Sequence, residues 1–156
     1  MPGYDYGRVG SYFVAICAFE RRCQFGSIRD GTMVANPIGE VIQEEWARSA
    51  AIRTEIALDA FVLMPNHLHG VIRIRSRAAP GSRGRGSRRA RTVSSFVAGF
   101  KAAVTSRTSR ARWLGNERVW QRGFFEHVIR DERELALIRR YIRANPVMWQ
   151  RDAEFR

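Results

Sequence analysis

Lysine and acidic residues are scarce in this sequence. Lys101 is the single lysine among 27 basic residues, and the 15 acidic residues leave a net charge of +12 and a pI near 11.3. Such an excess favours a polyanionic partner, most often nucleic acid, which arginine contacts through its bidentate guanidinium and by stacking on unpaired bases. A GC-rich genome would give the same arginine bias, so the charge predicts nucleic-acid binding without defining which nucleic acid.

Cysteine and long apolar runs are also lacking. Cys17 and Cys23 are too few for a disulfide framework and are not spaced like zinc ligands, so we expect two reduced cysteines without a chemical role. No apolar run reaches the roughly 18 residues of a membrane span, and the first residues have no hydrophobic signal core. We therefore expect one cytoplasmic domain over residues 1–156, with no membrane partner.

The order of apolar patterns predicts an α+β fold. Helical spacing follows the N-cap and proline pair at Asn36 and recurs after Thr92 and Asp131, whereas the other apolar runs have the length and turns of strands. The expected strands are 11–19, 55–64, 67–75 and 119–129, and the expected helices are 37–50, 93–104 and 131–145. This order predicts a ferredoxin-like (split βαβ) antiparallel sheet, with helices on one face, the other face free for a ligand, and an additional C-terminal helix.

A segment rich in Arg, Gly and Ser interrupts this pattern at residues 76–91. It has no apolar periodicity and cannot build a core, which predicts a flexible insertion. It is either a solvated linker or a basic arm that contacts a nucleic-acid backbone. The arginines that we expect to contact DNA here are Arg83, Arg85, Arg88 and Arg89.

Two histidines stand one residue apart at the start of the 67–75 strand. Side chains alternate along a strand, so His67 and His69 share a face with Arg73 and Arg75, which is mostly polar, while Leu68 and Ile72 face the core. The pair is either a bidentate mount for a divalent metal or two surface histidines at the end of a hairpin.

Tyr141 and Asn145 lie four residues apart in the expected last helix, so they are adjacent on its surface. We expect the helix to end at Asn145, before Pro146. His127 and Glu126 point to opposite faces of the 119–129 strand, and a structural role for His127 is favoured.

Three pieces of the sequence resemble one known family. They are Met-Pro-Asn-His-Leu-His-Gly (64–70), Val-Trp-Gln-Arg-Gly-Phe-Phe-Glu-His-Val-Ile-Arg (119–130) and Arg-Tyr-Ile-Arg-Ala-Asn-Pro-Val (140–147). In this order they look like the REP-associated tyrosine transposases of the HUH single-strand nuclease superfamily. The resemblance extends from Tyr12 to Trp149.

The resemblance implies a metal-dependent enzyme that cleaves and rejoins single-stranded hairpin DNA through a 5′-phosphotyrosine. It assigns Tyr141 as the nucleophile and His67 and His69 as ligands of Mg²⁺ or Mn²⁺. Asn145 stands where relatives place a further polar ligand, but it could instead cap the helix before proline. The family also implies a bacterial, nucleoid-associated protein that acts as a monomer or a homodimer.

A phenol has an ordinary pKa near 10, so a neighbouring positive charge must favour its ionised form during attack. Arg73, Arg75 and Arg143 are the candidates for this charge and for contacts with DNA.

Two other functions fit part of the sequence. A ferredoxin-like sheet with basic loops is also the plan of RNA-recognition domains, which bind nucleic acid without catalysis. That function requires aromatic side chains on the exposed strands, where this sequence offers histidine and arginine. A zinc-stabilised fold is disfavoured because no cysteines are placed to complete the ligand shell.

Overall fold

The computed structural model describes residues 9–75 and 93–149 and has the predicted α+β class. Its main sheet is antiparallel, in the order β4-β5-β1-β6, and this is the ferredoxin-like order. The strands are β1 (Gly10–Cys17), β4 (Ile56–Leu63), β5 (His67–Ile74) and β6 (Phe125–Ile129). The helices are α1 (Pro37–Ile52), α2 (Val93–Ala111) and α3 (Glu132–Met148).

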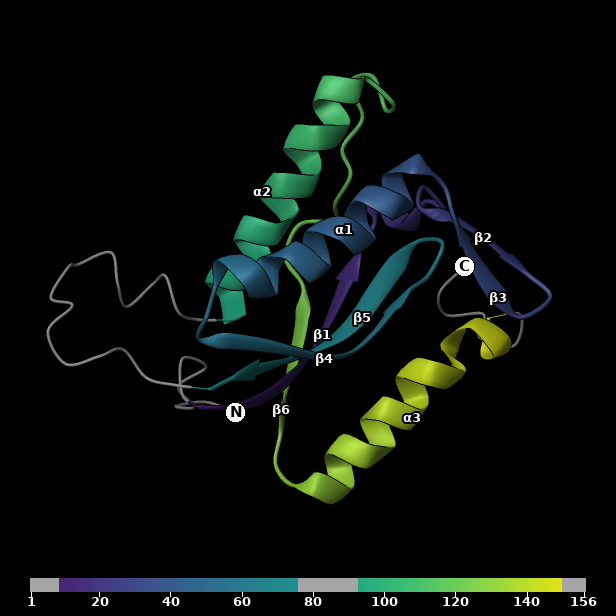
Figure 1. Ribbon diagram of the computed structural model, residues 1–156. Coiled ribbons are helices and arrows are strands. Elements are labelled where there is room, and N and C mark those ends of the chain that lie inside the picture. Colours follow the sequence, from purple (N-terminus) through teal and green to yellow (C-terminus); the bar gives the residue numbers. More distant parts are fainter. Residues whose placement is uncertain (1–8, 76–92, 150–156) are drawn as a thin grey trace, which may run out of the picture.

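The three helices lie on two sides of the sheet (Figure 1). Helices α1 and α2 cover one face, and α3 crosses the opposite face. The prediction that the second face is free for a ligand is therefore only partly right, since α3 borders it. This arrangement brings α3 back against β5, the strand that carries the two histidines.

The main hydrophobic core lies between the sheet and α1 and α2. Every second residue of β1 points into it, and Tyr12, Val14 and Ile16 are fully buried. Asn36 caps α1 as predicted, because its side chain accepts a hydrogen bond from the N–H of Gly39 at 2.9 Å. A smaller cluster of Val71, Ile129, Leu135 and Ile142 packs α3 against the other face, so apolar contacts hold the sheet from both sides.

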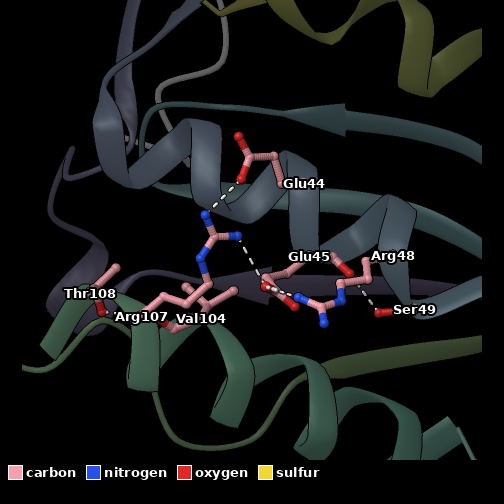
Figure 2. A network of polar contacts seen from close by, with 7 residues as sticks. All are labelled: Glu44, Glu45, Arg48, Ser49, Val104, Arg107 and Thr108. Atoms are coloured by element: carbon pink, nitrogen blue, oxygen red, sulfur yellow. Dashed lines mark hydrogen bonds and ion pairs between the residues drawn. The ribbon is translucent and has the colours of Figure 1, made fainter. Parts of the chain in front are cut away.

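An arginine fork joins the two helices of that layer (Figure 2). Arg107 of α2 donates to Glu44 at 2.7 Å and to Glu45 at 3.0 Å, both on α1. Glu45 is 6% exposed, and Arg107, together with Arg48 at 3.9 Å, neutralises this buried carboxylate. These residues stabilise the helical layer and lie on the side of the sheet opposite to the histidines.

The short hairpin of β2 (Gly26–Arg29) and β3 (Thr32–Ala35) was not predicted. Its turn is formed by Asp30 and Gly31, which have φ angles of 50° and 72°. Two positive φ angles in an Asp-Gly pair are typical of the tight turns that suit β-hairpins. The prediction missed the hairpin because its two strands have only four residues each.

Two predicted helix ends are wrong. Helix α2 continues past its predicted end at residue 104 to Ala111, because Thr108 is buried on the same inner side as Val104. Helix α3 continues past Asn145 to Met148, with Pro146 inside its last turn. Pro146 has no N–H to donate to the carbonyl oxygen of Ile142, and it lies within the last turn of the helix.

The predicted insertion at 76–91, with Arg83, Arg85, Arg88 and Arg89, lies outside the described residues. Within residues 9–75 and 93–149, no helix combines the length and the apolar character needed to cross a membrane.

Candidate active site

The two histidines of β5 form a buried pair. His67 and His69 are 1% and 2% exposed, and their ring centroids are 4.6 Å apart. They share a face with Val71 and the exposed Arg73, as the strand alternation predicts. The face itself is not mostly polar, however, because Trp149 at the end of α3 stacks on the His67 ring at 6.2 Å and Phe13 stacks on the His69 ring at 5.2 Å.

Burial keeps both imidazoles neutral. The pKa of His67 is lowered to about 4. Burial is the largest cause, the Asn145 side chain has a weaker opposite effect, and the charge of Arg21 adds a small lowering. Burial, followed by repulsion from His67, lowers the pKa of His69 to about 3. Both rings therefore have ring-nitrogen lone pairs at neutral pH, which is the state that binds a metal ion.

A neighbouring carboxamide orients the first ring. The side-chain oxygen of Asn66 lies 2.7 Å from Nδ1 of His67, and Asn66 is 1% exposed. If Nδ1 carries the proton, it donates to this oxygen and Nε2 keeps the lone pair. This is the usual way in which a second group fixes the tautomer of a histidine ligand.

Tyr141 lies beside this pair in the same chain. Its ring centroid is 5.4 Å from that of His69 and 6.4 Å from that of Phe13. Tyr141 is 44% exposed, in contrast with the buried histidines, so an incoming group can reach the phenol. The contact exists because α3 returns across the sheet (Figure 1), so that Tyr141 meets Phe13 of β1 and His69 of β5.

Tyr141 and His69 line one cleft of about 1000 Å³ between the sheet and α3. Glu134, Ile138 and Tyr141 line it from successive turns of α3. We call it the α3 cleft. Its other lining residues come from β1 (Phe13, Ala15, Cys17), β6 (Phe125, His127), α3 (Leu137), and the segments Arg21 and Gln121–Phe124.

Asn145 forms a contact within α3 and lies beside His67. Its amide nitrogen donates to the carbonyl oxygen of Tyr141 at 3.0 Å, which is a contact with the preceding turn of α3 and not a cap, since the helix continues to Met148. Its side chain is 6% exposed and is close enough to His67 to raise the pKa of that imidazole. Because the nitrogen is held by Tyr141, the amide oxygen is the atom available to the histidine side.

The residues present fit a divalent metal with open coordination positions. Two neutral imidazoles and one carboxamide oxygen supply three donors, and imidazole with amide oxygen suits Mn²⁺ better than Mg²⁺. Residues 9–75 and 93–149 contain no group of three His, Cys, Asp or Glu side chains that could hold a metal ion. A metal here thus depends on Asn145 as the third protein donor.

The predicted arginines do not line this cleft. Arg73 pairs with Asp59 at 3.8 Å, and Arg75 donates to the carbonyl oxygen of Ile56 at 3.4 Å. Both lie toward the far end of β5 from the histidines, and Arg143 is exposed on α3. None of the three is in a position on the cleft wall to act on the phenol.

Two other arginines that sequence reasoning missed do line the α3 cleft, namely Arg21 and Arg122. They stand in irregular segments, where no periodicity assigns a face to a side chain. His127 also faces the cleft and hydrogen-bonds to Glu134 of α3, so it joins β6 to α3, while Glu126 faces the other side of the sheet. Of the two residues, His127 is thus the one that faces the cleft, and the structural role favoured for it from the sequence stays a prediction.

Comparisons with known proteins define the class of the fold. The structure of a REP-associated tyrosine transposase bound to a REP hairpin matches 96% of this chain and 74% of its own, with a TM-score of 0.61 and 21% identity. The fold is therefore that of the REP-associated tyrosine transposases, in agreement with the sequence motifs.

A sequence relative then gives the family. An uncharacterized protein of Haemophilus influenzae is 35% identical over 163 residues, which cover 96% of this chain and 87% of that protein. This chain belongs to the family of the Haemophilus protein. No family model matches the sequence.

Proposed function

We propose that this protein is a metal-dependent tyrosine transposase that cleaves and rejoins single-stranded hairpin DNA. The observation that carries the proposal is the contact between the exposed phenol of Tyr141 and the buried ring of His69 in one cleft. The fold match supports it, because the matched transposase is bound to a REP hairpin. The net charge of +12 fits a nucleic-acid substrate.

Tyr141 is the nucleophile in this mechanism. Its oxygen attacks a phosphodiester, so that a bond forms between the tyrosine and the 5′ phosphate while the bond to the 3′ oxygen breaks. The phenol gives up its proton, and the released 3′ oxygen takes one up. In the reverse step, the 3′ hydroxyl of another strand attacks the phosphotyrosine and restores the phenol, so rejoining needs no ATP.

His67, His69 and Asn145 would hold the Mg²⁺ or Mn²⁺ ion. The ion would supply Lewis-acid polarisation of the phosphate and offset charge in the transition state. Asn66 keeps His67 in the ligating tautomer, and the backbone of α3 keeps Asn145 and Tyr141 at a fixed spacing. The half-exposed phenol is open to the DNA while the metal ligands stay shielded from water.

A binding module without catalysis is the second candidate. Phe125 is 59% exposed and lies 6.2 Å from Phe13 on the cleft side of the sheet, where unpaired bases could stack. This observation supports nucleic-acid binding in either function. It does not account for a buried pair of neutral histidines beside a tyrosine.

A covalent-adduct assay separates the two candidates. The protein is incubated with Mn²⁺ and a labelled hairpin pool whose single-stranded flanks are randomised, then denatured and resolved on a gel. We expect an adduct that a chelator prevents and that Tyr141→Phe abolishes. Tyr12→Phe is the matched control, because Tyr12 is fully buried in the opposite layer and should leave the adduct in place.

An adduct that survives Tyr141→Phe would show that another residue is the nucleophile. Binding of the hairpin without any adduct, in the presence of either metal, would favour the binding module.

A further inference from the structure

Arg21 occupies a position that the proposed mechanism has not yet used. It ends the short 3₁₀ turn η1 (Phe19–Arg21), which follows β1, and it lines the α3 cleft together with His69 and Tyr141. Its charge is close enough to His67 to lower the pKa of that imidazole. A permanent positive charge therefore lies near His67, on the wall of the cleft that His69 and Tyr141 also line.

The backbone holds Arg21 in a costly conformation. Glu20 and Arg21 have φ angles of 52° and 53°, in the left-handed region that non-glycine residues avoid at a cost of about 1 kcal/mol each. Hydrogen bonds retain this shape: the N–H of Arg21 donates to Ala18 at 2.9 Å, and the N–H of Glu20 donates to the Gln121 side chain at 3.0 Å. Backbone strain retained in this way is frequent at functional sites.

One carboxamide ties Arg21 to the histidine pair. The Asn66 side chain donates from its nitrogen to the carbonyl oxygen of Arg21 at 3.2 Å, and its oxygen lies 2.7 Å from Nδ1 of His67. The same buried group thus orients the His67 ring and fixes the backbone that carries Arg21. Asn66 therefore sets the distance between the arginine and the first histidine.

The neighbouring arginine has a different environment. Arg22 donates to Glu20 at 2.7 Å and pairs with Glu117 at 3.0 Å, and it does not line the cleft. The acidic residue on the cleft wall, Glu134, is bound to His127 and to the N–H of Arg130. The α3 cleft is lined by two arginines, Arg21 and Arg122, and by one carboxylate, Glu134, so its charge favours an anionic ligand.

We propose that Arg21 is a catalytic residue whose guanidinium binds a nonbridging oxygen of the phosphate that Tyr141 attacks. This inference rests on the proposed function. The guanidinium holds the phosphorus in line with the phenol and offsets the negative charge that develops as the tyrosine–phosphorus bond forms. Arg21 thereby supplies the positive charge for which the sequence analysis offered Arg73, Arg75 and Arg143.

The test compares adduct formation by Arg21→Gln, Arg21→Lys and the matched control Arg22→Gln under single-turnover conditions with Mn²⁺ and the hairpin DNA. Loss of one preorganised donor typically slows chemistry by about 100-fold, which is the expected result for Arg21→Gln. Arg21→Lys should keep part of the rate, since it retains the charge but loses the bidentate geometry. Arg22→Gln should remain within about threefold of the wild type, because it changes a surface ion pair.

Two further measurements distinguish a phosphate contact from a structural role. The first uses a substrate with a methyl group in place of one nonbridging oxygen at the cleaved phosphate, which removes the charge there. We expect the ratio of wild-type to Arg21→Gln rates to fall from about 100 to about 1 with this substrate, since the donor then has no charge to offset. The second is Mn²⁺ binding by electron paramagnetic resonance, which should be unchanged in Arg21→Gln.

Equal rates of Arg21→Gln and Arg22→Gln would overturn the role of Arg21, as would a rate ratio that stays the same with the neutral substrate. Loss of Mn²⁺ binding in Arg21→Gln would make Arg21 a support of the histidine pair instead. A wild-type protein that forms no adduct at all would overturn the proposed function itself, and this inference with it.

Discussion

Gly70, directly after His69, lies where the sheet packs most closely against Trp46 of α1. A Cβ atom at this position would lie 2.4 Å from Cζ2 and 2.6 Å from Cη2 of Trp46. Trp46 is 3% exposed and packs among Phe61, Phe96 and Phe100, so its indole ring has no room to retreat. The glycine of the His-Leu-His-Gly motif is therefore explained by packing against α1.

We expect Gly70→Ala to lower the free energy of unfolding by about 1–3 kcal/mol, the usual cost of overpacking a core. Gly99→Ala is the matched control, because nothing lies within 4 Å of a Cβ at that position of α2. Alanine there should raise stability by about 0.5–1 kcal/mol through its better helix propensity. Urea unfolding of the two variants checks both signs, and equal effects would contradict the packing explanation.

The histidine pair predicts a pH dependence of stability. The folded protein keeps His67 and His69 neutral down to about pH 4 and 3, whereas the unfolded chain protonates them below its ordinary pKa of 6.5. The unfolded state then binds more protons, so stability is full above pH 6.5 and falls as the pH decreases toward 4. Each imidazole should cost about 2 kcal/mol between pH 7 and pH 5.

His69→Leu should reduce this acid loss by about 2 kcal/mol, because leucine is apolar and does not titrate. Urea unfolding of wild type and variant at pH 7 and pH 5, without metal, gives the comparison. The same acid loss in both proteins would mean that His69 is not kept neutral by burial.

At the scale of elements, the position of Tyr141 depends on how α3 is fastened to the sheet. Arg139 donates to the two oxygens of Asp59 on β4 at 2.7 Å and 2.5 Å. This bidentate pair holds the pKa of the Asp59 carboxyl below its usual value. A shift of strand register between Leu58 and Phe61 accompanies Asp59, so the contact occurs where β4 is irregular.

We predict that Arg139→Lys loosens α3 without disturbing the core. Lysine keeps the charge but loses the fork, so amide hydrogen exchange in α3 should become faster by about tenfold while exchange in β1 and β5 stays the same. Arg140→Lys is the control, since Arg140 is exposed on the same helix. Unchanged exchange in α3 would show that its apolar contacts, and not this fork, hold the helix.

The element order could be predicted from the sequence because each long helix and strand has its own apolar period. The caps at Asn36 and Asp131 are correct for the same local reason, since each side chain accepts from a backbone N–H three residues later. The β2–β3 hairpin was too short to show a period. The continuation of α3 past Pro146 was missed because the prediction ended the helix at the residue before the proline, whereas Pro146 lies within the last turn.

The site was predictable only in part. The family resemblance assigned the pair His67 and His69 and the pair Tyr141 and Asn145 to one site, and the structure brings these four side chains together. Their burial was not predictable, since it depends on Phe13 and Trp149 packing from other elements. Arg21 was missed because its position follows from a left-handed turn and from Asn66, neither of which has a sequence period.

At the scale of the whole molecule, the path of the chain determines which subunit supplies the tyrosine. Helix α3 crosses its own sheet and contacts β4 and β3, and Tyr141 lies 5.4 Å from His69 of the same chain. A single chain thus contains both the phenol and the histidine pair. If two subunits exchanged their α3 helices, the contact between Arg139 and Asp59 of the same chain would have to break.

We therefore predict that each chain acts with its own tyrosine. Tyr141→Phe alone and the double variant His67→Ala, His69→Ala should each form no adduct, and an equal mixture of the two should form none either. If subunits exchanged their tyrosine helices, random pairing in the mixture would restore about a quarter of the wild-type adduct. The mixture must be refolded together before the assay, so that any exchange of helices can occur, and its gel is compared with wild type diluted fourfold. Adduct at that level would mean that α3 crosses to a partner when DNA is processed, and the cleft would then be built from two chains.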